Sequence, residues 1–121
     1  YGLAWPERMA SGATALDFRT LNDLSFEAID SDGHRARYPG LALAWEALAA
    51  APGSCAVLNA ANEVAVAAFL ERRIRFDQIH HVNRATLDGV LPGAPDDVPA
   101  LLDLDARARA AADEAVQALA R

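Results

Sequence analysis

The segment CAVLNAANEVAVAAFLER (residues 55–72) decides the fold of this chain. It is apolar almost all the way round a helix, which is typical of a helix buried on every side. Pro52-Gly53 stops any helix that arrives from upstream, and Ser54 suits the cap of the next one. The sequence therefore predicts a central, buried helix over residues 55–72, against which the rest of the chain packs.

A helix is also predicted before this segment, from about Tyr38. Pro39 suits the first helical position, where its missing N–H costs nothing. Apolar side chains then recur at i, i+3, i+4 and i+7, a spacing that marks the buried face of a helix. We expect the inner face to consist of Leu41, Ala44, Trp45 and Leu48.

A third helix is predicted after the central one, with Asp77 at its N-cap and Pro92-Gly93-Ala94-Pro95 at its end. Its expected inner side consists of Ile79, Val82, Thr86 and Leu87. Short loops between these helices favour antiparallel neighbours in a small bundle.

The last helix is predicted to start near Asp103 or Asp105 and to run to the C-terminus. On its outer side Arg109 and Asp113 follow Asp105 at spacings of four, which predicts a ladder of exposed ion pairs. The expected inner stripe consists of Leu104, Ala108, Ala111, Ala115 and Leu119.

Residues 1–37 have a different pattern. Residues 24–29 alternate between apolar and polar side chains, as in a half-buried strand, and Asp32-Gly33 suits a tight turn. One strand cannot form a sheet, so we expect this segment to pair with something outside the chain. The predicted fold is thus mainly α: a small antiparallel helical bundle over residues 38–121, preceded by an extended linker with a short β-strand over residues 1–37.

Composition narrows the classes of function. The net charge is −6 and all 11 basic residues are arginine, which argues against nucleic-acid binding and excludes chemistry that needs lysine. The single cysteine, Cys55, cannot form an internal disulfide, and no apolar run is long enough to cross a membrane. We therefore expect a cytoplasmic protein. Because Tyr1 is not an initiating Met, we also expect the chain to be part of a longer one.

Three polar residues on the central helix are not explained by its periodicity. Asn59, Asn62 and Glu63 fall together on one face, which continues with Val66 and Leu70, two side chains expected to be buried. In one interpretation the three are structural: they bond the loop backbone or lie near the helix start, where the helix dipole favours Glu. In the other they line the wall of an active site.

Other candidate groups favour structural roles. His80 and His81 are adjacent on a predicted helix and point about 100° apart, so they cannot share one metal ion in the usual i, i+4 manner. His34 has no partner at ligand spacing, and Cys55 is expected to pack as a small apolar side chain. The sequence contains no glycine-rich phosphate loop, CxxC or HExxH pattern.

Several segments, in order, resemble one enzyme family, the 1-deoxy-D-xylulose 5-phosphate reductoisomerases of the non-mevalonate isoprenoid pathway. The matching segments are Ala4-Trp5-Pro6-Glu7-Arg8, Ser11-Gly12, Leu16-Asp17-Phe18, residues 38–47, Leu58-Asn59-Ala60-Ala61-Asn62-Glu63, residues 66–70, Ile74 with Phe76, and Leu104-Asp105-Ala106-Arg107-Ala108-Arg109. The resemblance covers essentially the whole chain. Residues 30–37 depart from it, because they form a longer and more polar stretch than is usual in the family.

The resemblance implies that the parent protein converts 1-deoxy-D-xylulose 5-phosphate to 2-C-methyl-D-erythritol 4-phosphate, using NADPH and Mg²⁺ or Mn²⁺. In this family the dinucleotide-binding domain and the central catalytic domain lie upstream, so no catalytic, cofactor-binding or metal-binding role carries over to this chain. The resemblance further implies that residues 1–37 are the linker and edge of the central domain, and that the parent is a homodimer.

In that interpretation the C-terminal bundle supports the active site, with Asn59, Asn62 and Glu63 as candidate supporting residues. The alternative is a free-standing helical interaction module of shared ancestry that performs no chemistry. Whether coding sequence continues upstream of Tyr1 distinguishes the two.

Overall fold

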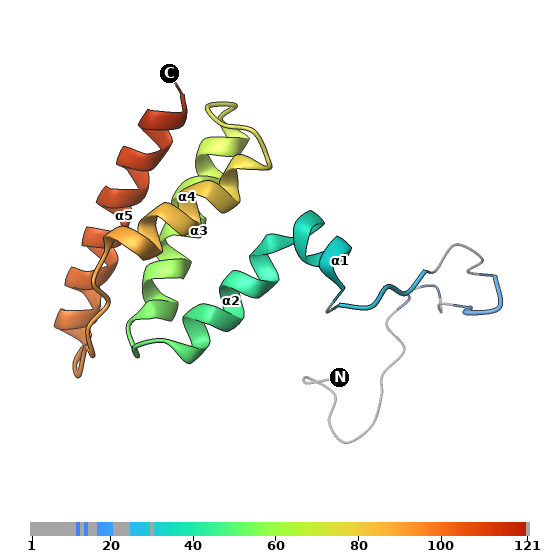
Figure 1. Cartoon of the computed structure of the whole chain (residues 1–121), viewed down its shortest axis with the longest axis horizontal. Helices are drawn as coiled ribbons and strands as arrows, with labels where there is room; N and C mark the ends of the chain where they lie inside the picture. Colours follow the sequence, from blue (N-terminus) through green and yellow to red (C-terminus); the bar gives the residue numbers. More distant parts are fainter. Residues whose placement is uncertain (1–11, 13, 15–16, 21–24, 30, 121) are drawn as a thin grey trace.

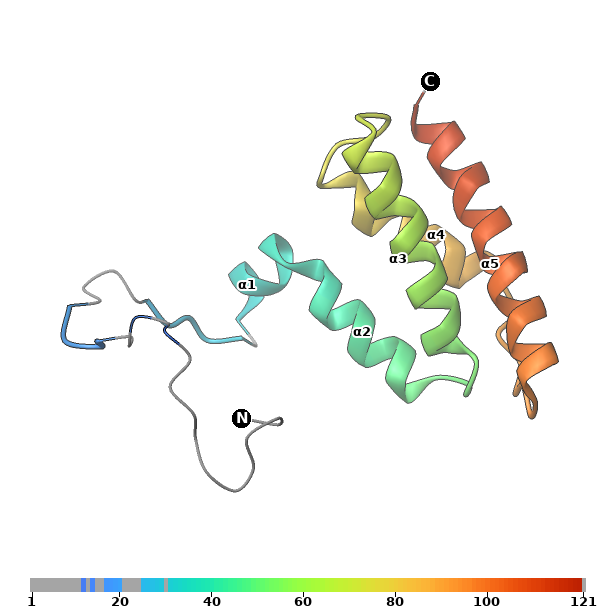
Figure 2. The same ribbon diagram turned by 180° about the vertical axis from the view of Figure 1, so that it is seen from behind.

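A computed structural model describes residues 12, 14, 17–20, 25–29 and 31–120 of the chain. Within these residues the only regular elements are five α-helices: α1 (Asp32–Arg37), α2 (Pro39–Ala49), α3 (Ser54–Leu70), α4 (Gln78–Gly89) and α5 (Val98–Leu119). From α2 onward each helix runs back along the one before it (Figures 1 and 2). The predicted small antiparallel helical bundle is therefore confirmed.

The bundle is centred on α3, as predicted, because α3 packs against α2, α4 and α5. Its buried positions are mostly alanine, and alanine also supplies much of the facing side of α5. Small side chains let the two helix axes approach closely, so the core is built from short contacts between many small groups. The fully buried side chains of this contact include Ala61, Ala65 and Ala68 of α3 and Leu104, Ala108, Ala112 and Val116 of α5.

The ends of α3 follow from local backbone chemistry. Ser54 is its first residue and Gly53 its N-cap, so the serine stands one position later than predicted. At the other end, Arg72 has φ of 61°, the left-handed conformation that terminates helices. The helix therefore stops at Leu70, two residues before the predicted end.

Gly53 also lies at a close contact between two loops, the α2–α3 turn and the loop that leads into α5. A Cβ atom at this position would overlap the carbonyl oxygen of Pro92 and would lie 2.7 Å from Cδ2 of Leu104. The backbone N–H of Gly53 donates to the carbonyl of Gly93 at 3.3 Å. Only glycine fits where the α2–α3 turn meets the loop that leads into α5.

The predicted N-cap residue of α4 is confirmed, and the predicted start of α5 is corrected. Asp77 is the N-cap residue of α4 but makes no capping hydrogen bond, because its carboxylate binds Arg75 at 2.7 Å. The helix α5 starts at Val98, well before the predicted Asp103 or Asp105. Its cap is Asp97, whose side chain accepts a hydrogen bond from the backbone N–H of Ala100 at 2.7 Å.

The inner stripes of these helices are largely as predicted. On α4, Val82 and Thr86 are buried and the other two predicted residues pack partly buried against the core. On α5 the fully buried line is Leu104, Ala108, Ala112 and Val116, while Ala111, Ala115 and Leu119 are only partly buried. The fully buried residues of α5 therefore recur at every fourth position. On the outer side, Arg109 pairs with Asp105 as predicted, but Asp113 is exposed and does not join the ladder of ion pairs.

The predicted inner face of α2 is wrong. Leu43 and Ala47 are the buried residues of this helix, each only 3% exposed. Trp45 and Leu48 are 64% and 65% exposed, and Leu41 is 38% exposed. The apolar stripe read from the sequence is real, but most of its side chains are exposed instead of packed in the bundle core.

The residues before α2 also differ from the prediction. Asp32 and Gly33 start the short helix α1 instead of a tight turn, because the Ser31 side chain caps that helix by accepting from the backbone N–H of His34 at 3.2 Å. Residues 25–29 form no strand, and Leu24 lies outside the described residues. A strand needs a second strand for its hydrogen bonds, and the expected partner was outside this chain. Among the described residues, no helix is long and apolar enough to cross a membrane.

Candidate functional site

The polar face of α3 is solvent-exposed in the bundle. Asn59, Asn62 and Glu63 are all exposed, although the pattern predicted a buried face. Leu70, at the end of the same face, is 72% exposed, and Val66 is only half-buried. The three polar residues therefore need no buried backbone partner, and each binds another side chain instead.

Glu63 lies at the centre of an ion-pair network between α3 and α5. It accepts a hydrogen bond from Asn59 Nδ2 at 3.2 Å and one from Arg109 Nη2 at 2.7 Å. Arg109 also binds Asp105 on its own helix, at 2.7 Å. The hydrogen bond from Arg109, followed by that from Asn59, holds the pKa of Glu63 below its usual range, and the two carboxylates raise the pKa of Arg109.

The sequence predicts Arg109 on the outer, solvated side of α5 and predicts its pair with Asp105. It does not predict the pair with Glu63, which lies 46 residues away in the sequence. Spacing within one helix predicts only partners on the same helix. A pair between helices depends on how the two helices pack.

Asn62 binds α4. The side chain of Asn83 donates from Nδ2 to Oδ1 of Asn62 at 3.1 Å. Asn83 is only 8% exposed, and its Oδ1 atom is buried without a hydrogen-bond partner in the described part of the chain. An unsatisfied buried acceptor costs about 1–3 kcal/mol. Asn83 was not among the predicted site residues, although a polar side chain between Ile79 and Thr86 on the apolar stripe of α4 was a usable signal.

Two grooves flank this pair of amides, and both are lined by Asn62 and Asn83. The α2–α3 groove, of about 490 Å³, also contacts Leu43, Leu48 and Cys55. The α2–α4 groove, of about 760 Å³, lies between the start of α2 and the start of α4. Its apolar lining consists mainly of Leu41, Val66, Phe76 and Ile79.

The α2–α4 groove contains the two adjacent histidines. His81 is exposed. The ring centroids of His80 and His81 lie 6.0 Å apart, and the planes of the two rings are inclined at 60° to each other. Partial burial, and next the charge of His81, lower the pKa of His80. Cys55 is exposed and does not pack as the small buried side chain that was predicted.

No metal site is formed by the described residues, because no three of their His, Cys, Asp and Glu side chains come together. His34 lies 3.9 Å from a carboxylate oxygen of Glu27, and its ring packs at an angle against the ring of Tyr38. These contacts are consistent with a structural role for His34. Among the matching segments, residues 4–8, Ser11 and Leu16 lie outside the described residues.

A second ion pair, which the sequence did not reveal, holds α2 to α4. Arg84 donates to both carboxylate oxygens of Glu46, at 2.8 and 2.9 Å, and also contacts Asp88 at 3.3 Å. The hydrogen bonds from Arg84 hold the pKa of Glu46 below its usual range. This bidentate geometry fixes the orientation of α2 at the grooves.

Comparison with known proteins gives one consistent result. The family model described as the DXP reductoisomerase C-terminal domain matches residues 1–111. The 1-deoxy-D-xylulose 5-phosphate reductoisomerase of Nitrosococcus oceani is 48% identical over 117 residues, which are 97% of this chain and 29% of that protein. The enzyme of the same name from Ralstonia nicotianae is 47% identical over 118 residues, 98% of this chain and 29% of that protein.

The fold agrees with a solved structure. The 1-deoxy-D-xylulose 5-phosphate reductoisomerase from Zymomonas mobilis, in complex with NADPH, superimposes with a TM-score of 0.77 and 40% sequence identity. The match covers 95% of this chain and 29% of that one, so the chain spans less than a third of the length of the relatives it matches. With the family model, the relatives and the fold in agreement, this chain belongs to the DXP reductoisomerase family and corresponds to its C-terminal helical domain.

Proposed function

We propose that this chain is the support domain of a larger enzyme that converts 1-deoxy-D-xylulose 5-phosphate to 2-C-methyl-D-erythritol 4-phosphate with NADPH, in the non-mevalonate pathway of isoprenoid synthesis. The proposal is supported chiefly by how little of each relative's length this chain covers. At 48% identity the match takes in 97% of this chain but only 29% of the relative. A domain of this size, matched so completely, is a part of the whole enzyme.

The residues of this chain fit neither cofactor of the proposed reaction. The sequence has no lysine and no glycine-rich loop for a dinucleotide phosphate. In the described residues no set of three carboxylate, histidine or cysteine groups converges to bind Mg²⁺ or Mn²⁺. We therefore derive no chemical step from this chain, and we assign the metal and NADPH to the upstream domains.

The supporting role falls to the polar face of α3. Glu63 and Arg109 hold α3 and α5 in a fixed relation, and Asn59 orients the carboxylate of Glu63. Asn62 is exposed and keeps free hydrogen-bonding capacity beside the grooves. We propose that Asn59, Asn62 and Glu63 hold loops of the catalytic domain by hydrogen bonds, across an interface that begins at residues 1–37.

We further propose a homodimeric parent in the cytoplasm. The cytoplasmic part rests on the single, unpaired Cys55, which suits a reducing compartment.

The test compares three proteins: the full-length gene product, the same product ending before residue 38, and this 121-residue chain. We expect substrate-dependent NADPH consumption by the full-length protein, a large loss on truncation and none by the chain alone. Full activity of the truncated protein would end the support-domain proposal. A native gene product with a mass near 12.8 kDa would favour the interaction module instead.

The role of Asn59 is tested by Asn59→Ala in the full-length protein. We expect a lower turnover rate or a lower melting temperature, since the orientation of Glu63 is lost. Unchanged kinetics together with an unchanged melting temperature would exclude Asn59 as a supporting residue.

A further inference from the structure

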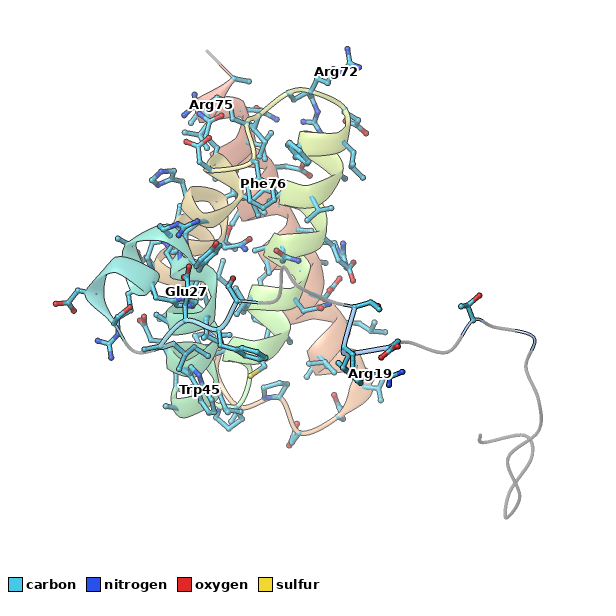
Figure 3. All side chains as sticks on the ribbon, turned by 90° about the vertical axis from the view of Figure 1, so that its right-hand side faces the viewer. Arg19, Glu27, Trp45, Arg72, Arg75 and Phe76 are labelled. Atoms are coloured by element: carbon cyan, nitrogen blue, oxygen red, sulfur yellow. The ribbon has the colours of Figure 1, made fainter. Side chains whose placement is uncertain are left out.

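The α2–α4 groove is the larger of the two grooves and has the size of a site for a small molecule. Its volume of about 760 Å³ lies within the range of about 300–1,000 Å³ that is typical of such sites. The groove separates α1 from α4, since both helices line it and they do not pack against each other in the described structure. Figure 3 looks onto this side of the molecule, with α1 and α2 in front and Phe76 above them.

One part of the groove lining is apolar. Phe76 is 74% exposed, and its ring packs edge-on against Phe69 with the ring centroids 5.6 Å apart. Leu41 on α2 is 38% exposed, and Val66 and Ile79 are half-buried. A ligand that covers such side chains removes apolar surface from water, which favours binding. The groove can therefore hold the apolar part of a ligand.

The other part of the lining is basic, although the chain as a whole has a net charge of −6. Two of the four basic side chains come from α1 and two from α4; they are Arg35, Arg37, His80 and His81. Asp77 is the one acidic side chain that the described residues contribute to this lining, and its carboxylate is bound by Arg75 at 2.7 Å. The groove therefore presents positive charge on an acidic chain, and it favours an anion.

The two arginines of α1 have the chemistry to bind that anion. Both are exposed. Arg37 lies 3.6 Å from a carboxylate oxygen of Glu27, which is too far for a hydrogen bond, and its guanidinium lies 5.2 Å from the centre of the Tyr38 ring. Neither contact occupies the five N–H donors of the guanidinium. Arginine binds carboxylate and phosphate groups with two parallel hydrogen bonds.

We propose that the α2–α4 groove binds a small amphiphilic anion. The apolar part of the ligand packs between Leu41, Phe76 and Ile79. Its carboxylate or phosphate group binds Arg35 and Arg37. The inference does not depend on the proposed function, because it rests on the size, charge and lining of the groove. It adds a ligand site to a domain that holds neither cofactor of the proposed reaction.

Binding is tested with octyl phosphate and octanoate as probes, by isothermal titration calorimetry of the full-length protein. Inorganic phosphate and 1-octanol are the controls, because the first has only the charged part and the second lacks the charge. We expect one probe or both to bind at least about tenfold more tightly than either control, since each buried methylene group contributes about fourfold. The probe that binds more tightly identifies the charged group. If neither probe binds more tightly than both controls, the proposal is wrong.

The position of the bound anion is tested by a double variant, Arg35→Gln with Arg37→Gln. The matched control is Arg72→Gln with Arg107→Gln, two arginines that line neither groove. All four are exposed, and each pair includes one arginine that contacts a carboxylate. We expect the affinity for the probe to fall about fivefold or more in the first variant, since two exposed ion pairs are lost, and less than about twofold in the control. Equal affinities of the two variants would place the anion elsewhere in the protein and overturn the proposal.

A second measurement does not depend on the stability of any variant. In the full-length protein with labelled isoleucine methyl groups, the NMR signal of Ile79, which lines the groove, should shift as the probe is added. The signal of Ile74, which is 6% exposed and lines neither groove, should stay in place. No shift at Ile79, or equal shifts at Ile79 and Ile74, would contradict binding in the α2–α4 groove.

Discussion

The two halves of this molecule use their apolar residues differently. In the core formed by α3, α4 and α5, side chains such as Ala61, Val82 and Val116 are fully buried. In the arm formed by α1 and α2, α1 buries nothing and α2 buries only Leu43 and Ala47. The arm nevertheless has large apolar side chains, and most of them are exposed.

This difference shows which contacts the chain can make alone. The core buries apolar side chains along α3, α4 and α5, although Leu70 and Leu102 on these helices are exposed, so its stability depends on packing that is present in the described residues. The arm is fixed to the core through the pair of Glu46 and Arg84 and through a small contact with α3. The remaining large apolar side chains of the arm, Trp45 and Leu48 among them, are exposed, and exposed apolar surface of this kind often marks an interaction site.

The largest effect is expected for Leu104→Ala in the core. Leu104 is 1% exposed and packs with Val57, Ala60 and Ala108, none of which is large enough to fill the space it would leave. A cavity of this kind costs about 2–5 kcal/mol of the free energy of unfolding. Urea unfolding of the 121-residue chain, followed by circular dichroism, measures the loss.

The control for Leu104 is Leu102→Ala, on the same helix but 64% exposed. We expect it to change the free energy of unfolding by less than about 0.5 kcal/mol. If the two variants unfold alike, the core does not carry the stability of the chain, and the contrast with the arm fails.

A smaller loss is expected for Gly53→Ala, at the joint where the arm enters the core. The added methyl group would meet the carbonyl oxygen of Pro92 and Cδ2 of Leu104, so the loop into α5 must shift. Overpacking of this kind costs about 1–3 kcal/mol. Gly89→Ala is the control, because a methyl group there meets nothing within 4 Å and alanine favours the helix. An equal or higher melting temperature for Gly53→Ala would show that the joint is loose.

The core could be predicted from the sequence because its signals are local. The continuous apolar pattern of α3 needs no knowledge of other helices. The first-turn position of Pro39 is a local signal of the same kind, which marks the start of α2 in the arm. The start of α5 was missed because Pro99 was not recognised as a first-turn proline after the capping Asp97. That signal was present in the sequence.

The face of α2 could not be predicted, for a physical reason. Periodicity locates an apolar stripe but does not say whether its partner is in the same domain. Trp45 and Leu48 form such a stripe and are exposed here. Prediction of the candidate site was limited in the same way. The sequence pattern identified Asn59, Asn62 and Glu63 on one helix. It could not identify their partners Asn83 and Arg109 on other helices, because those contacts depend on how the helices pack.

The smallest effect is expected from pH, and it distinguishes the arm from the core. Hydrogen bonds from arginine lower the pKa of both Glu46 and Glu63 in the folded chain. A carboxylate with a lowered folded pKa stabilises the fold above the pKa of the unfolded state, about 4.3 for Glu. That contribution is lost as the pH falls through the lower, folded pKa. Both pairs are largely exposed, so salt and solvent keep the effect small.

Acid should therefore loosen the arm before it unfolds the core, because Glu46 pairs α2 with α4 while the core is held mainly by apolar packing. Trp45, adjacent to Glu46, reports on the arm once Trp5 is replaced by Phe, since the chain has two tryptophans. In Glu46→Gln the fluorescence of Trp45 should no longer change below about pH 4.3. Glu63→Gln, whose exposed pair with Arg109 joins the two core helices α3 and α5, should leave that change in place. If the fluorescence and the helix content change together in every variant, the arm and the core unfold as one unit. The two regions would then differ in burial but not in stability.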